Sequence, residues 1–164
     1  MNKHKNKLKI MTQMIADRSI NTDECIAAST YTNIEFPYLI KKLNILNAML
    51  NSHFNPKFQR ISANQKNNPK YLERLKDRIV FYCFNEQEFN NTHSHIYLKV
   101  PSDLCFQSVV DKMQELFLKL DDRTNPKRKF RYKIYHETID DQFAYCDYVL
   151  KRYDIENDLS HIVI

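Results

Sequence analysis

Residues 78–84 read RIVFYCF and residues 93–100 read HSHIYLKV, and a short polar segment separates the two runs. Both runs are rich in β-branched and aromatic residues, and Pro101 ends the second one. Such runs are typical of β-strands, and a short polar connection between them is typical of a hairpin. We therefore predict two adjacent antiparallel strands here.

The sequence after this hairpin predicts a helix, a strand and a second helix. Ser102 is a candidate N-cap, and the apolar residues that follow it lie at helical spacing. These residues are Val109, Met113, Leu116 and Leu120. After a loop at 121–128, residues 129–137 alternate in the manner of a strand, and a last helix is expected from about 141 to 153.

The sequence before the hairpin predicts a strand and a helix. Residues 25–32 read CIAASTYT, and Asn33 and Pro37 follow as helix-start signals. Four leucines then form one apolar stripe, with steps of four and three residues. They are Leu39, Leu43, Leu46 and Leu50. Residues 51–68 are polar and are expected to form a loop.

The predicted order of elements is β-α-β-β-α-β, followed by a terminal helix. This order is the split βαβ arrangement of a ferredoxin-like sandwich, which belongs to the α+β class. We expect a central antiparallel sheet whose helices cover one face and leave the other face open. Fold alone does not decide the activity.

Length and composition fit one soluble domain. The chain has 164 residues, of which 43% are hydrophobic and 27% are charged. No apolar run approaches the roughly 20 residues of a membrane-spanning helix, and the N-terminus lacks the apolar stretch of a signal peptide. We expect a cytoplasmic protein, or a nuclear one if it comes from a eukaryotic virus, that makes no membrane contact.

Residues 1–20 form a basic N-terminal extension that precedes the domain at 21–164. Its lysines are Lys3, Lys5, Lys7 and Lys9. The extension is either a solvated tail or an arm that contacts DNA. A net charge of +5 and a pI near 8.9 favour a polyanionic partner.

Two residue types exclude some kinds of site. The chain has no glycine, which excludes a Walker-type P-loop and the GxGxxG dinucleotide turn, because both need a close approach of the backbone to phosphate. Its four cysteines form no CxxC pair, so we expect buried free thiols and neither a zinc site nor a disulfide framework. They are Cys25, Cys83, Cys105 and Cys146.

His93 and His95 are the first candidate site residues. Side chains two apart on a strand point to the same face, so both imidazoles would lie on the open face, about 7 Å apart along the strand. Two imidazoles at that spacing can converge on one ion. An HxH pair alone is weak evidence for a metal site, and two surface histidines without a metal are the alternative interpretation.

Glu86 strengthens the metal interpretation. It lies seven residues before His93, at the end of the neighbouring strand, so its carboxylate can reach the same spot across the hairpin. Glu88 is an alternative donor. A mixed nitrogen and oxygen site with open positions suits Mg²⁺ or Mn²⁺ that holds a phosphate. An exposed charge at a strand end is the other interpretation of Glu86.

Tyr148 and Lys151 share a face of the last predicted helix, because they lie at i and i+3. A phenol has an ordinary pKa near 10, so as a nucleophile it needs a metal that polarises the phosphate and a nearby cation. Lys151 could supply that cation. Such a pair also often only decorates a helix.

In this chain order, Glu86, HSH at 93–95 and YVLK at 148–151 resemble the HUH endonucleases. The resemblance is to the nuclease domain of the single-tyrosine Rep proteins, which initiate rolling-circle replication. It spans about residues 25–153, and ASTYTN at 28–33 is similar to the strand that opens the Rep fold.

The resemblance implies Tyr148 as nucleophile, Lys151 as its helper, and a metal bound by the two histidines and Glu86. It also implies nicking and rejoining of single-stranded DNA at a replication origin through a 5′-phosphotyrosine, with a helicase and a polymerase acting in trans. The middle position of the motif is usually hydrophobic, and here it is Ser94. Tyr145, one turn before Tyr148, remains an alternative nucleophile.

DNA is expected to lie over the open sheet face, where cations contact phosphate and aromatic rings stack on bases. The predicted contacts are Tyr97, Lys99, Lys127, Arg128, Lys129, Arg131, Lys133 and Tyr135. Two alternatives remain. One is a ferredoxin-like module that binds nucleic acid without cutting it, and the other is a relaxase or small transposase of the HUH superfamily.

Overall fold

The computed structural model of the chain describes residues 3–17, 20–30, 36–55, 69, 77–88, 91–120, 132–150 and 161–163. At 22–30, 132–137 and 161–163, among other positions, it describes the backbone only. The described part is an α+β structure. Its strands are β1 (Ile20–Thr30), β2 (Val80–Glu88), β3 (Asn91–Lys99), β4 (Tyr132–Thr138) and β5 (His161–Val163). Its helices are α1 (Lys3–Ala16), α2 (Phe36–Phe54), α4 (Phe106–Lys119) and α5 (Gln142–Val149).

The five strands form one sheet in the order β4-β1-β3-β2-β5, and every neighbouring pair is antiparallel. The predicted hairpin is confirmed, because β2 pairs with β3 from Val80 opposite Lys99 to Glu88 opposite Asn91. β1 begins earlier than predicted, at Ile20, and β5 was not predicted at all. The hairpin therefore occupies an interior position in the sheet, between β1 and β5.

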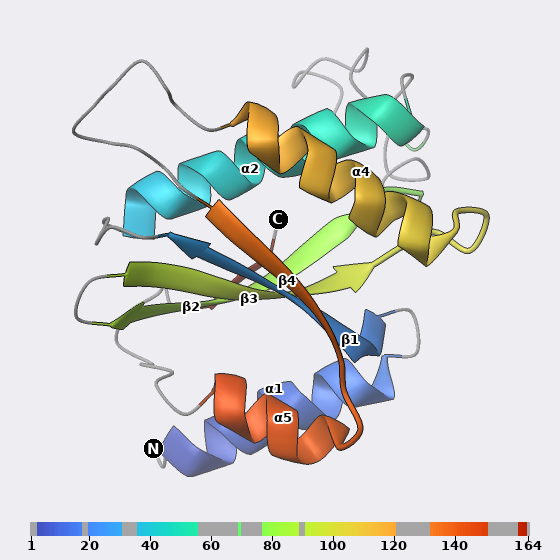
Figure 1. The fold of residues 1–164 in the computed structure, drawn as a ribbon. Coiled ribbons are helices and arrows are strands. Elements are labelled where there is room, and N and C mark those ends of the chain that lie inside the picture. The colour runs from blue at the N-terminus through green and yellow to red at the C-terminus, as the bar shows by residue number, and fades with distance from the viewer. Residues whose placement is uncertain are drawn as a thin grey trace.

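Helices α2 and α4 lie side by side on one face of the sheet (Figure 1). The buried apolar side chains between these helices and the sheet form the first core. Its members are Leu39, Leu43, Leu46, Leu50, Ile79, Phe81, Cys83, Ile96, Leu98, Val109, Val110, Met113, Leu116 and Phe117. All four leucines of the stripe on α2 are fully buried, as their spacing predicted.

Helices α1 and α5 pack against each other on the opposite face (Figure 1). The side chains buried there form the second core, which consists of Met11, Met14, Ile20, Phe84, Tyr97, Ile139, Val149 and Leu150. The predicted open face is therefore wrong. Strands β2 and β3 also carry large aromatic rings on this side, notably Phe84 and Tyr97. Exposure of their apolar surface to water is unfavourable, and packing of the helices against it removes that surface from water.

The N-terminal segment is neither a tail nor a free arm. Residues 3–16 form α1, whose Met11 and Met14 are buried in the second core while Lys9 is exposed. The four lysines suggested a solvated segment, but the apolar residues at 10, 11, 14 and 15 follow helical spacing and give the helix a buried face.

Helix α4 begins later than its cap signal suggested. Ser102 lies in a turn in which the Leu104 amide donates to the Pro101 carbonyl at 3.0 Å. Cys105 occupies the N-cap position and makes no side-chain cap hydrogen bond. Its thiol is exposed, whereas Cys83 is buried, so the prediction of buried thiols is correct for Cys83 and wrong for Cys105.

Two buried asparagines on α2 bind the residue that precedes β2. The Ile79 amide donates to Asn51 Oδ1 at 2.9 Å, and Asn51 Nδ2 donates to the Ile79 carbonyl at 3.0 Å. Asn47 Nδ2 donates to the same carbonyl at 3.1 Å. The start of β2 is thereby fixed to α2. In the part of the chain that the structure describes, no helix is both long and apolar enough to cross a membrane.

Candidate metal centre

His93 and His95 stand on the second-core face of β3. Their strand neighbours Ile96 and Leu98 lie in the first core on the opposite side, which confirms the predicted alternation. In the hairpin register, Glu86 is directly opposite His93, and Phe84 is directly opposite His95. Residues directly opposite one another on antiparallel strands share a face, so the carboxylate and both imidazoles are brought to one side of the sheet.

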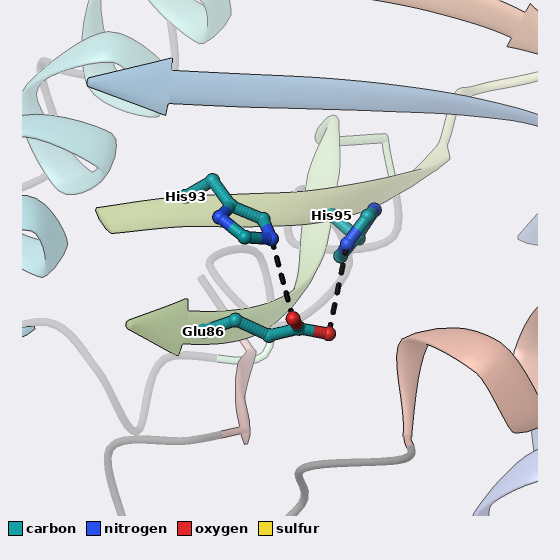
Figure 2. A group of neighbouring side chains, drawn as sticks. All are labelled: Glu86, His93 and His95. Carbon is teal, nitrogen blue, oxygen red and sulfur yellow. Dashed lines mark ion pairs between the residues drawn. The ribbon is translucent and has the colours of Figure 1, made fainter. Parts of the chain in front are cut away.

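The carboxylate of Glu86 lies between the two imidazoles (Figure 2). Its Oε2 is 3.3 Å from His93 Nε2, and its Oε1 is 3.8 Å from His95 Nε2. The three potential ligand atoms lie within 4.8 Å of one another. This group could hold a metal ion, and it is the one such group among the residues that the structure describes.

Of the two predicted carboxylate donors, Glu86 is the one in the group. Glu88 pairs with Asn91 at the turn end of the hairpin, two residues beyond the pair of Glu86 and His93. Glu86 is 3% exposed, so it is not the exposed strand-end charge of the alternative interpretation. Burial of a carboxylate is costly unless its charge is compensated, and here the two neighbouring imidazoles or a bound cation can compensate it.

His93 is the most exposed of the three residues. The His93 side chain is 15% exposed, whereas the side chains of His95 and Glu86 are 6% and 2% exposed. An ion or a ligand would therefore approach beside His93.

Helix α5 carries two tyrosines that lie beside His95. The ring of Tyr148 is centred 5.8 Å from the imidazole of His95, and the ring of Tyr145 is centred 6.2 Å from it. Tyr148 is 48% exposed, while Tyr145 is half-buried. The terminal helix thus brings a solvent-accessible phenol to the rim of the metal centre.

One of the predicted DNA contacts, Tyr97, is not accessible in the structure. Tyr97 is fully buried in the second core, where Tyr145 packs on it, so its ring is not accessible for stacking on a base. Lys99 is partly exposed and lies six residues from His93 along β3, about 20 Å away, and its contact with DNA stays a prediction. The expectation of an open face produced the prediction for Tyr97, and α1 and α5 cover that face.

The other predicted contacts are described in part or not at all. Lys133 pairs with Ser29, which pairs with His93, and Tyr135 pairs with Ala27, which pairs with His95. The backbone therefore places Lys133 and Tyr135 in the same cross-strand rows as the histidines. Lys127, Arg128, Lys129, Arg131 and Lys151 lie outside the described residues.

Phe84 is a residue of the site that the sequence did not single out. It stands opposite His95 and packs its ring edge-on against Tyr97 at 6.0 Å. The signal was present, because Tyr82, Phe84 and Glu86 alternate along the strand as one face.

No protein-family model, no curated protein and no solved structure matches this chain. The proposed function therefore depends on the metal centre and on the helix that carries the tyrosines.

Proposed function

We propose that this chain is a metal-dependent nuclease that nicks and rejoins single-stranded DNA with Tyr148 as the nucleophile, in the manner of the single-tyrosine HUH replication initiators. One observation carries the proposal. The exposed phenol of Tyr148 lies beside a buried cluster of two imidazoles and a carboxylate, although Tyr148 is more than fifty residues away in the sequence.

The topology supports the same proposal. The order β4-β1-β3-β2, with α2 and α4 together on one face, is the one expected for a ferredoxin-like split βαβ unit. Helices α1 and α5 and strand β5 are then additions to this unit. In this reading the HSH strand is central in the sheet, and the last helix supplies the tyrosine from the opposite side to α2 and α4.

The donor set fits a cation that binds phosphate. Glu86, His93 and His95 would hold Mg²⁺ or Mn²⁺ and leave positions open for substrate oxygens. When bound, the cation polarises the scissile phosphate and offsets charge as the P–O bonds change. No glycine-rich phosphate loop is needed for this chemistry.

The chain's own groups then perform the transfer. Tyr148 loses its phenolic proton to solvent and its oxygen attacks phosphorus. The bond from phosphorus to the 3′-oxygen breaks, and that oxygen takes up a proton from solvent. The products are a 5′-phosphotyrosine and a free 3′-hydroxyl. Attack by a 3′-hydroxyl reverses the step and rejoins the strand, and no nucleotide is hydrolysed because the phosphodiester energy is kept.

The path of the DNA differs from the one that the sequence suggested. His93 and Tyr148 are the accessible members of the site, so the strand is proposed to pass along this side. The row that contains Lys133 extends from His93 towards β4 and offers a cation for a neighbouring phosphate. We retain Lys151 as the proposed cation near Tyr148.

Covalent capture tests the proposal. A labelled pool of single-stranded DNA of random sequence is incubated with the protein and Mn²⁺, and adducts that resist SDS are isolated. We expect an adduct with the wild-type protein, none with Tyr148→Phe, and an unchanged one with Tyr38→Phe, a tyrosine of α2. An adduct that survives in Tyr148→Phe would exclude this nucleophile.

A metal-ligand variant separates cutting from binding. We expect His95→Ala to form no adduct while it retains most of its affinity for single-stranded DNA, because phosphate contacts elsewhere supply that affinity. If His95→Ala cleaves like the wild type, the metal assignment is wrong.

The structure also bears on the two alternatives. A module that binds nucleic acid without cutting needs an accessible aromatic sheet face, and in the described residues α1 and α5 cover that face. A relaxase commonly gathers three histidines, whereas the third ligand here is Glu86. Both observations favour the single-tyrosine nuclease.

A further inference from the structure

Tyr145 lies between three aromatic rings, one of which is the imidazole of His95. Its ring centroid is 6.5 Å from Tyr97, 6.2 Å from His95 and 5.9 Å from Tyr148. Tyr97 is fully buried and belongs to β3, as His95 does. Tyr145 therefore joins the tyrosine helix to the strand that supplies both imidazoles.

The orientation of His95 depends on its neighbours. Rotation of an imidazole about χ2 is broad, so contacts with neighbouring groups, aromatic packing among them, hold its plane. The rings of Tyr145, Tyr148 and His93 all approach His95 nearly at right angles, with interplanar angles of 86°, 81° and 83°. Such edge-to-face contacts are the preferred geometry of aromatic pairs. Tyr145 is less exposed than Tyr148 and its ring packs on the buried ring of Tyr97, so it is the more extensively packed of the two helix contacts.

We propose that Tyr145 is a positioning residue whose ring orients His95 towards Glu86 and sets the place of Tyr148 relative to the metal centre. The part that concerns Tyr148 rests on the proposed nuclease function, while the part that concerns His95 is independent of it. The phenolic oxygen of Tyr145 is not used as a nucleophile. Of the two tyrosines that share one face of α5, Tyr148 is then the nucleophile and Tyr145 the positioning residue.

Metal binding without DNA tests the first part. Mn²⁺ titrations, followed by electron paramagnetic resonance, compare wild type, Tyr145→Phe and Tyr145→Ala. We expect Tyr145→Ala to weaken binding about tenfold, as loss of a group that orients a ligand does, and Tyr145→Phe to stay within about twofold. Equal losses in the two variants, or no loss in Tyr145→Ala, would overturn the proposal.

Tyr82→Ala is the matched control. Tyr82 is also a half-buried tyrosine of the second core, but it pairs with Tyr97, two residues along the strand from His95. We expect its loss to leave Mn²⁺ affinity within about twofold of the wild type. A loss equal to that of Tyr145→Ala would show a general effect of core loosening and would overturn the proposal.

Single-turnover adduct formation tests the second part. We expect Tyr145→Phe to retain the adduct and Tyr145→Ala to form it at least about tenfold more slowly at saturating Mn²⁺. An adduct lost in Tyr145→Phe would make Tyr145 a nucleophile and refute the positioning role. Tyr145→Leu, which keeps apolar volume without the ring, replaces Tyr145→Ala if circular dichroism shows that the alanine variant is unfolded.

The two readouts separate this inference from the nuclease function. Tight Mn²⁺ binding that weakens in Tyr145→Ala, in a protein that forms no adduct with DNA, supports the orientation of His95 and refutes the nuclease. Absence of Mn²⁺ binding by the wild-type protein refutes both.

Discussion

The two faces of the sheet are built by the same strands and differ in what they bury. Between the sheet and α2 and α4, Phe81, Cys83, Ile96 and Leu98 pack with the stripes of the helices. Between the sheet and α1 and α5, rings pack around a carboxylate and two imidazoles. Alternation along a strand lets one hairpin contribute to both cores, so the carboxylate and the two imidazoles lie beside a second core and not on an open surface.

The largest expected effect comes from two phenylalanines of β2 that are both buried but face opposite sides. Phe81→Ala and Phe84→Ala should each lower the free energy of unfolding by about 3–5 kcal/mol, because each leaves a cavity. Only Phe84 stands opposite His95, so only Phe84→Ala should also weaken Mn²⁺ binding by the folded protein. Urea unfolding and metal titration at low temperature measure the two effects; an equal loss of metal affinity in both variants would contradict the separation of the faces.

A smaller loss of stability is expected from Met14→Ala in α1. Met14 is buried in the second core, and the cost should be about 2 kcal/mol, near the low end for buried methionine. Because α1 packs on α5, amide hydrogen exchange should increase in α5 as well as in α1. Faster exchange confined to α1 would show that α5 does not depend on it.

Asn51→Ala should lower the free energy of unfolding of the protein by about 1–3 kcal/mol, because the Ile79 amide and carbonyl lose a buried partner. The matched control is Asn44→Ala on the same helix. Asn44 is exposed and donates to the Ile40 carbonyl, so its loss should change stability by less than about 0.5 kcal/mol. Thermal unfolding measures both variants, and equal shifts in Tm would contradict the proposed difference.

The smallest effect concerns the solvent side of α4. Glu115 accepts hydrogen bonds from Lys112 and Lys119, which lower the pKa of its carboxyl from 4.5 to about 2. A pKa lowered on folding adds stability above pH 4.5, and this stability is lost as the pH falls towards 2. The group is exposed, so salt should weaken the effect. Glu115→Gln should lower Tm slightly at pH 7 and low salt, but not at pH 2; a constant difference across this range would refute the assignment.

The sequence predicted the elements that have a strong period. The leucines of α2, the two strands of the hairpin and the shared face of His93 and His95 all follow from spacing, which requires no knowledge of distant contacts. Glu86 could be placed for the same reason, since a hairpin pairs residues that are close in the sequence.

The second core could not be predicted from local pattern. Its members come from both ends of the chain, from Met11 to Leu150, and only tertiary packing brings them together. The lysines in the first turns of α1 suggested a solvated segment, although the helix also has an apolar face. Alternation along β3 predicted correctly the face of the sheet on which Tyr97 lies, but it could not predict that helices cover this face. The position of Tyr145 against His95 likewise depends on how α5 docks, which no spacing in the sequence encodes.

The hydrogen bonds from α2 to Ile79 also oppose a change of register in the hairpin that carries Glu86, His93 and His95. A shift of β2 by one residue relative to β3 would turn Glu86 towards α2 and α4. The residues on either side of Glu86 would then face the second core. Asn51 engages both the amide and the carbonyl of Ile79, so this slipped pairing would break two buried hydrogen bonds. A polar side chain on the opposite face of the sheet thus helps to hold β2 in the register that places Glu86 beside His93.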